Sequence, residues 1–266
     1  MNSSIPLDVW AVLAALLGLN IGSFLNVVIY RVPAGESVVR PPSKCPQCGH
    51  EIRNRHNIPV FGWLMLRGKC FDCGNPISPR YPIVEFVTGA LFVAFTLDHT
   101  KLGWALPAYL YFAAVGVALT MIDFDHKRLP DKIVLPSYPV IAALLTVGAA
   151  VDHNWSALER AGIGAAALFA FYFIIAFAYP AGMGFGDVKL SGILGGVLAH
   201  LSWGTLVAGA FGAFLLGAVV GAIVIAARKG DRKTAIPFGP FMIVAATLAI
   251  FVGAPLAHWY THLTAR

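Results

Sequence analysis

Apolar residues in this chain gather into long runs that are separated by short polar stretches. A run of about 20 apolar residues is the length that crosses a bilayer as an α-helix. Eight segments of this kind, two of them short, cover residues 7–30, 83–97, 105–122, 133–151, 161–179, 188–200, 205–227 and 238–258. The pattern therefore predicts an all-α polytopic membrane protein with about eight transmembrane helices.

The composition agrees with a chain that lies mostly in lipid. Hydrophobic residues make up 58% of the 266 positions and charged residues only 12%. A soluble domain carries roughly 25% charged residues, and a disordered chain needs high charge and low hydrophobicity. Both of these classes are therefore excluded, and the lipid bilayer is an expected partner.

The positive charges predict which side of the membrane each polar stretch occupies. Eight Lys and Arg lie in the loop 31–80, three follow the third segment, one follows the fifth and four follow the seventh, whereas three lie on the other side. Cytoplasmic loops carry the excess of Lys and Arg. We therefore expect a first helix at 1–30, a cytoplasmic loop at 31–80, a bundle at 81–266, and both termini outside.

All four cysteines of the chain lie in the cytoplasmic loop and form two C-x2-C pairs. The pairs consist of Cys45, Cys48, Cys70 and Cys73. Two such pairs supply four thiolates for a tetrahedral zinc ion, although the 21 intervening residues slightly exceed the usual length of about 15 to 20. His50 and His56 are rival ligands, but four thiolates already fill the tetrahedral coordination sphere. We expect a structural zinc ion that staples this loop.

Three different roles for the cysteine pairs stay open. Two disulfides are disfavoured in a reducing cytoplasm, and a thioredoxin-type site needs only one pair in a βαβ setting. A zinc ribbon that binds nucleic acid is the third role, which the loop's positive charge allows and its few aromatic residues disfavour. We expect no nucleic-acid partner.

Carboxylates are scarce, and two sites share one edge of the membrane. Asp123, Asp125 and Asp131 follow the third segment, and Asp187 precedes the sixth. Two carboxylates that share one proton around a water molecule can cut a peptide bond. The glycines before Asp187 leave room for an extended peptide. An aspartyl dyad is therefore one hypothesis for the chemistry.

The same acids also fit roles outside peptide cleavage. Asp125 and Asp131 lie among basic residues and can be solvated loop acids, and Asp131 can start the fourth helix. Asp187 can cap the sixth helix, and Lys189 can extend along it towards the interface. A proton-coupled transporter also places acids in helices, but it is expected to show broken helices or repeats.

Five ordered motifs give the chain a resemblance to a known family. They lie at residues 22–31, 80–85, 122–131, 184–190 and 237–240, and the cysteine pairs accompany them. The sequence resembles the prepilin peptidases (type IV leader peptidases), which are membrane aspartyl proteases of the GxGD type. The resemblance covers nearly the whole chain.

The resemblance implies a function and assigns residues to it. The family's first catalytic aspartate lies seven residues before the proline of its LPD motif, which selects Asp123 and not Asp125, and Asp187 takes the second role. The residues of the active-site loop are Gly184, Gly186 and Lys189. Members cut the basic leader from prepilins of type IV pili or pseudopilins of type II secretion after a glycine, at the cytoplasmic membrane face. Those with the cysteine loop also N-methylate the new terminus with S-adenosylmethionine. A GxGD protease for other membrane proteins is the alternative.

Two polar residues inside the apolar segments are expected to have structural roles. Glu85 lies a few residues into the second segment, where we expect an ion pair with Arg31 or Arg80. An extension of its side chain towards the interface and a contact with the leader or a cofactor stay open as alternatives. Asn26 lies in the first segment, where an interhelical hydrogen bond is the expected role.

Overall fold

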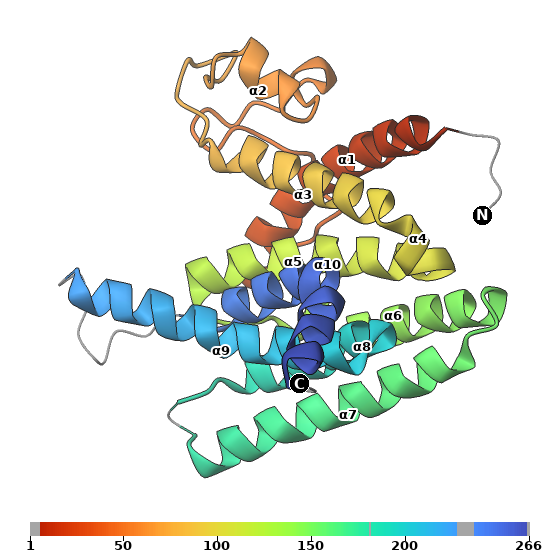
Figure 1. Cartoon of the computed structure of the whole chain (residues 1–266). Helices are drawn as coiled ribbons and strands as arrows, with labels where there is room; N and C mark the ends of the chain where they lie inside the picture. Colours follow the sequence, from red (N-terminus) through yellow and green to blue (C-terminus); the bar gives the residue numbers. More distant parts are fainter. Residues whose placement is uncertain (1–5, 181, 228–236, 265–266) are drawn as a thin grey trace. The chain divides into compact units, whose positions relative to one another are not determined.

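The computed structural model describes residues 6–180, 182–227 and 237–264, and these residues form helices and connecting loops. All eight predicted apolar segments are helical (Figure 1). The helices are α1 (Leu7–Ala34), α2 (Phe61–Met65), α3 (Arg80–Leu97), α4 (His99–Leu102), α5 (Leu106–His126), α6 (Asp131–Val151), α7 (Trp155–Ala178), α8 (Phe185–Leu201), α9 (Trp203–Ala226) and α10 (Gly239–Thr264). Short 3-10 turns cover Asn54–His56 and Gly103–Ala105.

Within the described residues, six helices are long and apolar enough to cross a membrane. They are α1, α3, α6, α7, α9 and the stretch Gly103–His126 that contains α5. The helix α8 has 17 residues, and Gly239–Gly253 in α10 forms a shorter apolar helix. The chain is therefore a polytopic membrane protein, and the number eight stays a prediction. The basic residues at 228–233 and Arg266 lie outside the described residues.

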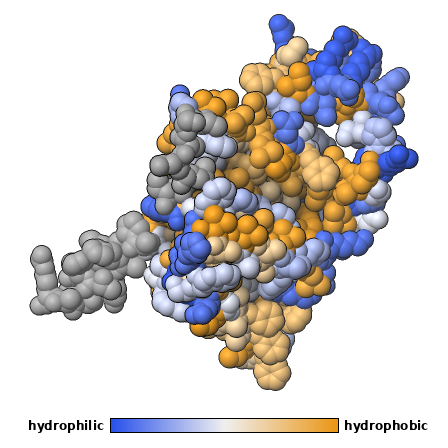
Figure 2. Space-filling model, turned by 90° about the vertical axis from the view of Figure 1, so that its right-hand side faces the viewer, coloured by the Kyte–Doolittle hydropathy of each residue, from blue (hydrophilic) through white to orange (hydrophobic). Residues whose placement is uncertain are grey.

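Apolar side chains cover much of the molecular face in Figure 2, as expected for a protein in contact with lipid. Many of the large exposed residues belong to the membrane-spanning helices, including Phe86, Ile174, Phe177 and Val207. Hydrophilic residues gather at the top of that view, on the loop between α1 and α3. We call residues 35–79 the cysteine loop.

The chain divides into two compact units, and the first comprises Met1–His99 and Ala113–Ala118. Its helices α1 and α3 lie side by side (Figure 1). Glycines allow this close approach, because a Cβ atom on Gly18 would lie 2.8 Å from the Cα of Gly89. The Nδ2 atom of Asn26 donates to the carbonyl of Tyr81 at 3.2 Å, which confirms the predicted interhelical hydrogen bond.

The second unit comprises Thr100–Phe112 and Leu119–Arg266. In this unit α7 packs along α8, and α9 packs along α10. Nearly all of α8 is buried from Val188 to Ala199. Helix α8 is therefore the central element of the unit, although it is the shortest of the helices that the eight apolar segments form.

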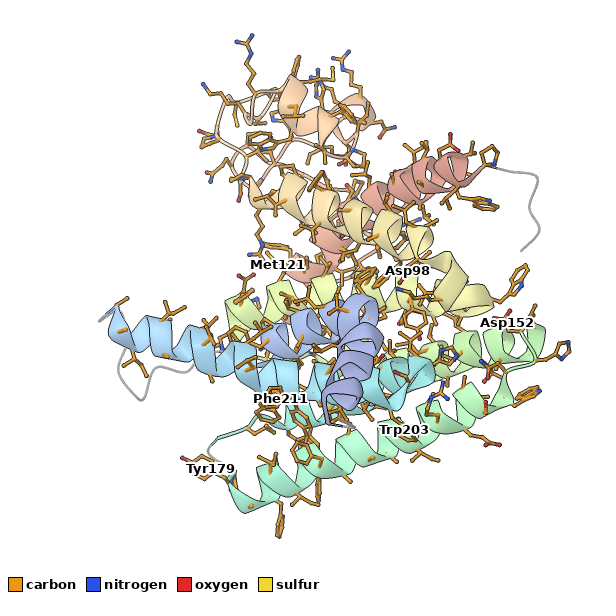
Figure 3. All side chains as sticks on the ribbon, viewed as in Figure 1. Asp98, Met121, Asp152, Tyr179, Trp203 and Phe211 are labelled. Carbon is orange, nitrogen blue, oxygen red and sulfur yellow. The ribbon has the colours of Figure 1, made fainter. Side chains whose placement is uncertain are left out.

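The turns at the two ends of the second unit carry different chemistry. Met121, near the end of α5, and Tyr179, after α7, lie towards one end of the unit, and Asp152 lies at the other end (Figure 3). At the Asp152 end, the guanidinium of Arg160 donates to the carbonyls of Ala199 and His200, both at 2.5 Å. These bonds satisfy carbonyls that the end of α8 leaves unpaired. The predicted catalytic residues lie at the opposite end.

Candidate functional site

Asp123 lies in the last turn of α5 and is buried. The helix ends at His126, because Lys127 adopts a left-handed conformation (φ 51°) and its N–H donates to the carbonyl of Asp123 at 2.8 Å. The side chain of Asp123 is only 4% exposed, whereas Asp125 is exposed. The structure therefore places Asp123 in the protein interior and Asp125 at its surface.

The start of α10 supplies the polar partner of Asp123. The backbone N–H of Gly239 donates to the Asp123 carboxylate. A Cβ atom at this glycine would lie 2.7 Å from Oδ2 of Asp123, so only glycine allows this approach without displacing the carboxylate. The unpaired N–H groups and the dipole of a helix N-terminus favour a negative charge. The motif at 237–240 thus belongs to the surroundings of Asp123.

Asp187 lies in the first turn of α8, ahead of the apolar part of that helix. Gly184 is the N-cap residue, and its backbone N–H donates to the carboxylate of Asp187. This is the half of a capping box in which an acid at the third helical position reaches back to the N-cap. The proposed capping role of Asp187 and its proposed catalytic role are therefore compatible.

The two carboxylates act on each other electrostatically. Burial, and then the negative charge of Asp123, raise the pKa of Asp187 to about 7, against the lowering effect of the Gly184 N–H. A like charge and poor hydration both disfavour the ionised form of an acid. The pair can therefore hold one proton near neutral pH, which is the state that general acid–base chemistry on a peptide bond needs.

Leu129 connects the three motifs that surround the carboxylates. Its Cβ would lie 3.1 Å from a Cβ atom on Gly186, and its Cδ2 would lie 3.3 Å from one on Gly239. The side chain is 8% exposed. The absence of side chains at Gly186 and Gly239 therefore leaves space for Leu129 between the beginnings of α8 and α10.

Lys189 forms an ion pair with the carboxylate of Asp131. Its Nζ atom lies 2.7 Å from Oδ1 and 2.9 Å from Oδ2 of Asp131, and 5.1 Å from the ring centroid of Phe185. Asp131 also lies in the first turn of α6, as one interpretation of the sequence expected.

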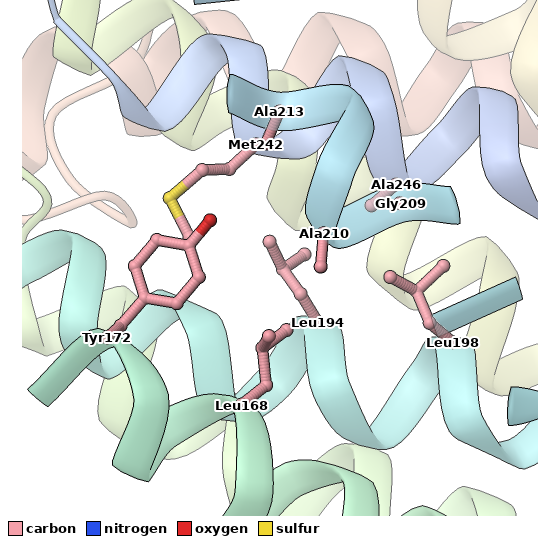
Figure 4. A pocket seen from close by; sticks show the side chains of 9 residues that line it. All are labelled: Leu168, Tyr172, Leu194, Leu198, Gly209, Ala210, Ala213, Met242 and Ala246. Carbon is pink, nitrogen blue, oxygen red and sulfur yellow. The ribbon is translucent and has the colours of Figure 1, made fainter. Parts of the chain in front are cut away.

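A small apolar cavity in the second unit offers no room for a substrate. Leu168 and Tyr172 of α7, Leu194 and Leu198 of α8, and residues of α9 and α10 line it (Figure 4). Its volume of ≈ 10 Å³ barely reaches the 10–15 Å³ that one water molecule requires. This cavity is therefore part of the apolar packing between the helices, and neither aspartate lines it.

The four cysteines of the first unit form one cluster. The Sγ atoms of Cys45, Cys48, Cys70 and Cys73 all lie within 4.8 Å of one another. The two C-x2-C turns are alike, since Gly49 and Gly74 have φ values of 75° and 71° and their N–H groups donate to the carbonyls of Cys45 and Cys70. Neither predicted rival ligand, His50 or His56, belongs to this cluster.

The sulfur geometry suits a metal ion better than disulfides. The Sγ atoms of Cys45 and Cys73, and those of Cys48 and Cys70, are 4.0 Å apart, far beyond a disulfide length of about 2.05 Å. Tetrahedral bonds of about 2.3 Å place sulfur atoms about 3.8 Å apart. The cluster can hold a metal ion.

The expected ion pair of Glu85 with Arg31 is wrong. The Oε2 atom of Glu85 accepts the backbone N–H of Val60 at 2.6 Å, and the carboxylate also bonds to Ser23. Arg31 donates instead to the carbonyls of Ser37 and Pro41 at 3.0 and 2.8 Å. Both side chains thus hold the backbone of the cysteine loop, because its turns leave backbone groups that need partners.

Sequence reasoning missed the individual roles of Gly239 and Leu129 and the partner of Lys189. Gly239 belongs to the motif at 237–240, but its contact with Asp123 depends on where α10 begins. The signal for the Lys189 pair was present, since Asp131 is an acid at the same predicted membrane edge. Only the packing of α6 against α8 selects it from the other acids.

Comparisons with known proteins agree with these observations. The model of the "Bacterial Peptidase A24 N-terminal domain" matches residues 16–99, and that of the "Type IV leader peptidase family" matches residues 110–226. The chain is 34% identical to a protein of Stutzerimonas stutzeri named "Prepilin leader peptidase/N-methyltransferase", over 93% of this chain and 92% of that protein. A protein of the same name from Dichelobacter nodosus is 36% identical, over 98% and 97%. No solved structure matches the chain.

Proposed function

This chain belongs to the type IV leader peptidase family, and from that premise we propose that it removes the leader peptide of prepilins or pseudopilins. The cut follows a glycine at the cytoplasmic face of the inner membrane. The enzyme also N-methylates the new amino terminus, as the double name of the relatives suggests.

One observation carries the proposal for the peptidase. Asp123 and Asp187 are 64 positions apart in the sequence, yet they lie near each other at one end of the second unit. The negative charge of Asp123 contributes to the raised pKa of Asp187. Each carboxylate accepts one backbone N–H, from Gly239 and Gly184 respectively. This arrangement supports an aspartyl dyad of Asp123 and Asp187.

The proposed reaction needs one proton on the pair. The ionised carboxylate takes a proton from a water molecule, which attacks the scissile carbonyl carbon, while the protonated carboxyl group donates to the carbonyl oxygen. The pair then returns a proton to the departing amine. The pair titrates as a unit, so the acid and the base are not assigned to single residues.

The cysteine cluster is proposed to hold a structural zinc ion. Cys45, Cys48, Cys70 and Cys73 provide four thiolates, which close the coordination sphere and leave no open position for catalysis. Metal binding stabilises the folded form of a small loop that has little core of its own. S-adenosylmethionine supplies the methyl group in the proposed second reaction.

The proposed topology follows from the charges of the chain. The cysteine loop and the dyad lie on the cytoplasmic side, both termini lie outside, and the bundle at 81–266 carries the peptidase. A prepilin has a charged leader followed by an apolar helix, so its scissile bond lies at the membrane edge where the dyad is proposed to lie.

The test is cleavage of a purified prepilin by the full-length protein in detergent or liposomes. Asp123→Asn and Asp187→Asn should each abolish cleavage while the protein still accumulates in the membrane, and Asp125→Asn, the matched exposed control, should cleave nearly normally. Mass spectrometry of the product reports cleavage and methylation together.

Two results would contradict the proposal. Normal processing by either variant of the dyad excludes the aspartyl mechanism. Efficient cleavage of a prepilin whose glycine before the cut is replaced would favour the alternative, a GxGD protease for other membrane proteins.

A further inference from the structure

One face of α6 contacts Lys189 at two points. The carboxylate of Asp131 binds its Nζ atom at 2.7 and 2.9 Å, and the hydroxyl of Tyr138 donates to its backbone carbonyl at 2.5 Å. Residues seven apart lie about two turns apart on the same side of a helix. Helix α6 therefore holds both the side chain and the main chain of one residue of α8.

Gly192 makes the second of these contacts possible. A Cβ atom at Gly192 would collide with the hydroxyl of Tyr138, so the glycine provides the space into which Tyr138 reaches. Lys189 lies two residues after Asp187 and one turn before Gly192. The two contacts thus fix the position of α8 along α6 directly beside the proposed dyad.

The start of α6 is also tied to Asp123. Only residues 127–130 separate the end of α5 from the start of α6, and the N–H of Lys127 bonds to the carbonyl of Asp123. Leu129, in this short turn, packs where Gly186 leaves space. Helix α6 therefore connects the segment that carries Asp123 with the segment that carries Asp187.

We propose that Asp131 and Tyr138 are positioning residues, which hold Lys189 and thereby set the placement of Asp187 relative to Asp123. This inference rests on the proposed peptidase function. Neither residue needs to touch the substrate, because each acts through Lys189.

The energetics separate this role from a merely structural one. Asp131 is 54% exposed at its side chain, and an ion pair with such exposure contributes little to folding. Catalysis is less tolerant, since a misplacement of about 1 Å can reduce a rate about 100-fold. Loss of the contacts should therefore lower the rate of cleavage much more than the stability of the fold.

The experiment measures kcat and KM for a purified prepilin, and the melting temperature, on full-length protein in detergent. Asp131→Ala and Tyr138→Phe should each lower kcat about 10- to 100-fold, with KM changed less than about threefold. Asp131→Asn keeps one acceptor oxygen for Lys189 and should recover most of the lost rate. In a Lys189→Met background, Asp131→Ala should cause no further loss.

Two matched controls separate position from chemistry. Thr146→Val removes a hydroxyl from the exposed, opposite part of α6, where it bonds only locally to Ala142. Asp8→Asn removes a negative charge from the first turn of α1. Both variants should keep the wild-type kcat.

Each outcome of the experiment supports or overturns the inference. Wild-type kcat in both Asp131→Ala and Tyr138→Phe overturns it while the peptidase function stands. A structural role would lower kcat together with the melting temperature, by more than about 5 °C, and Asp131→Asn would not recover the rate. That combination also overturns the inference. A wild-type protein that leaves prepilin intact contradicts the proposed function itself.

Discussion

Replacing Asp187 by asparagine should stabilise the folded protein at alkaline pH while it abolishes cleavage. The folded state raises the pKa of this acid to about 7, above the value of about 3.9 that an unfolded chain gives. The folded protein therefore binds this proton more tightly, and its stability falls as the pH rises from about 4 through 7. Asparagine has no such loss and keeps an oxygen for the N–H of Gly184.

The size of the effect follows from the pKa of Asp187. The change from 3.8 to about 7 corresponds to a ceiling of about 4 kcal/mol at 1.36 kcal/mol per pKa unit. The side chain is only half-buried, so screening by water reduces this to about 1–3 kcal/mol. For a chain of this size the melting temperature should rise by roughly 3–10 °C at pH 8. Tryptophan fluorescence during heating in detergent measures it.

The comparison of two pH values tests the reasoning. At pH 4, Asp187 is protonated in the folded protein and about half protonated in the unfolded chain, and the difference between the variant and the wild type should shrink to a small fraction of its value at pH 8. A difference of equal size at both pH values, or none at pH 8, would refute the argument. Asp125→Asn serves as the control, since it also removes one carboxylate from this end of the unit but at an exposed position.

Three further predictions concern single contacts and the metal. Gly239→Ala places a Cβ atom 2.7 Å from Oδ2 of Asp123 and should lower kcat at least about tenfold, whereas Gly221→Ala meets no atom within 4 Å and should not. Metal analysis should find one zinc ion per chain, and Cys45→Ser should remove it and expose the cysteine loop to limited proteolysis. Glu85→Ala should also expose this loop to protease, whereas Glu85→Gln, which keeps an acceptor, should protect it.

The apolar pattern predicts the long helices of the described residues, but it misplaces the ends of some of them. The apolar run predicts the start of α7 at residue 161, but the helix begins at Trp155, because its first two turns contain the charged residues Glu159 and Arg160. Asn154 caps its first turn, and Arg160 lies inside the helix and binds carbonyls at the end of α8. A charge that finds its partner on another helix is compatible with a helix interior, and no local pattern indicates such a partner.

The candidate site was predictable in its residue types and less so in its contacts. Positions two apart on a helix point in different directions, so Asp123 and Asp125 cannot both face the interior, and the apolar pattern alone does not select one. The family motif selected Asp123, which is the buried one. The residue types favour an ion pair of Glu85 with an arginine, yet its carboxylate accepts the backbone N–H of Val60. Backbone partners depend on the loop's conformation, which residue types do not reveal.

The surroundings of the proposed dyad combine to keep a proton on it. Each carboxylate accepts a single N–H, from Gly184 at the cap of α8 and from Gly239 at the start of α10. These partial charges hold the acids in place. Lys189 lies only two residues from Asp187, and a lysine that paired with this acid would lower its pKa and release the proton. Asp131 binds the lysine instead, so in the proposed mechanism the acid on α6 supports both the protonation of Asp187 and its position.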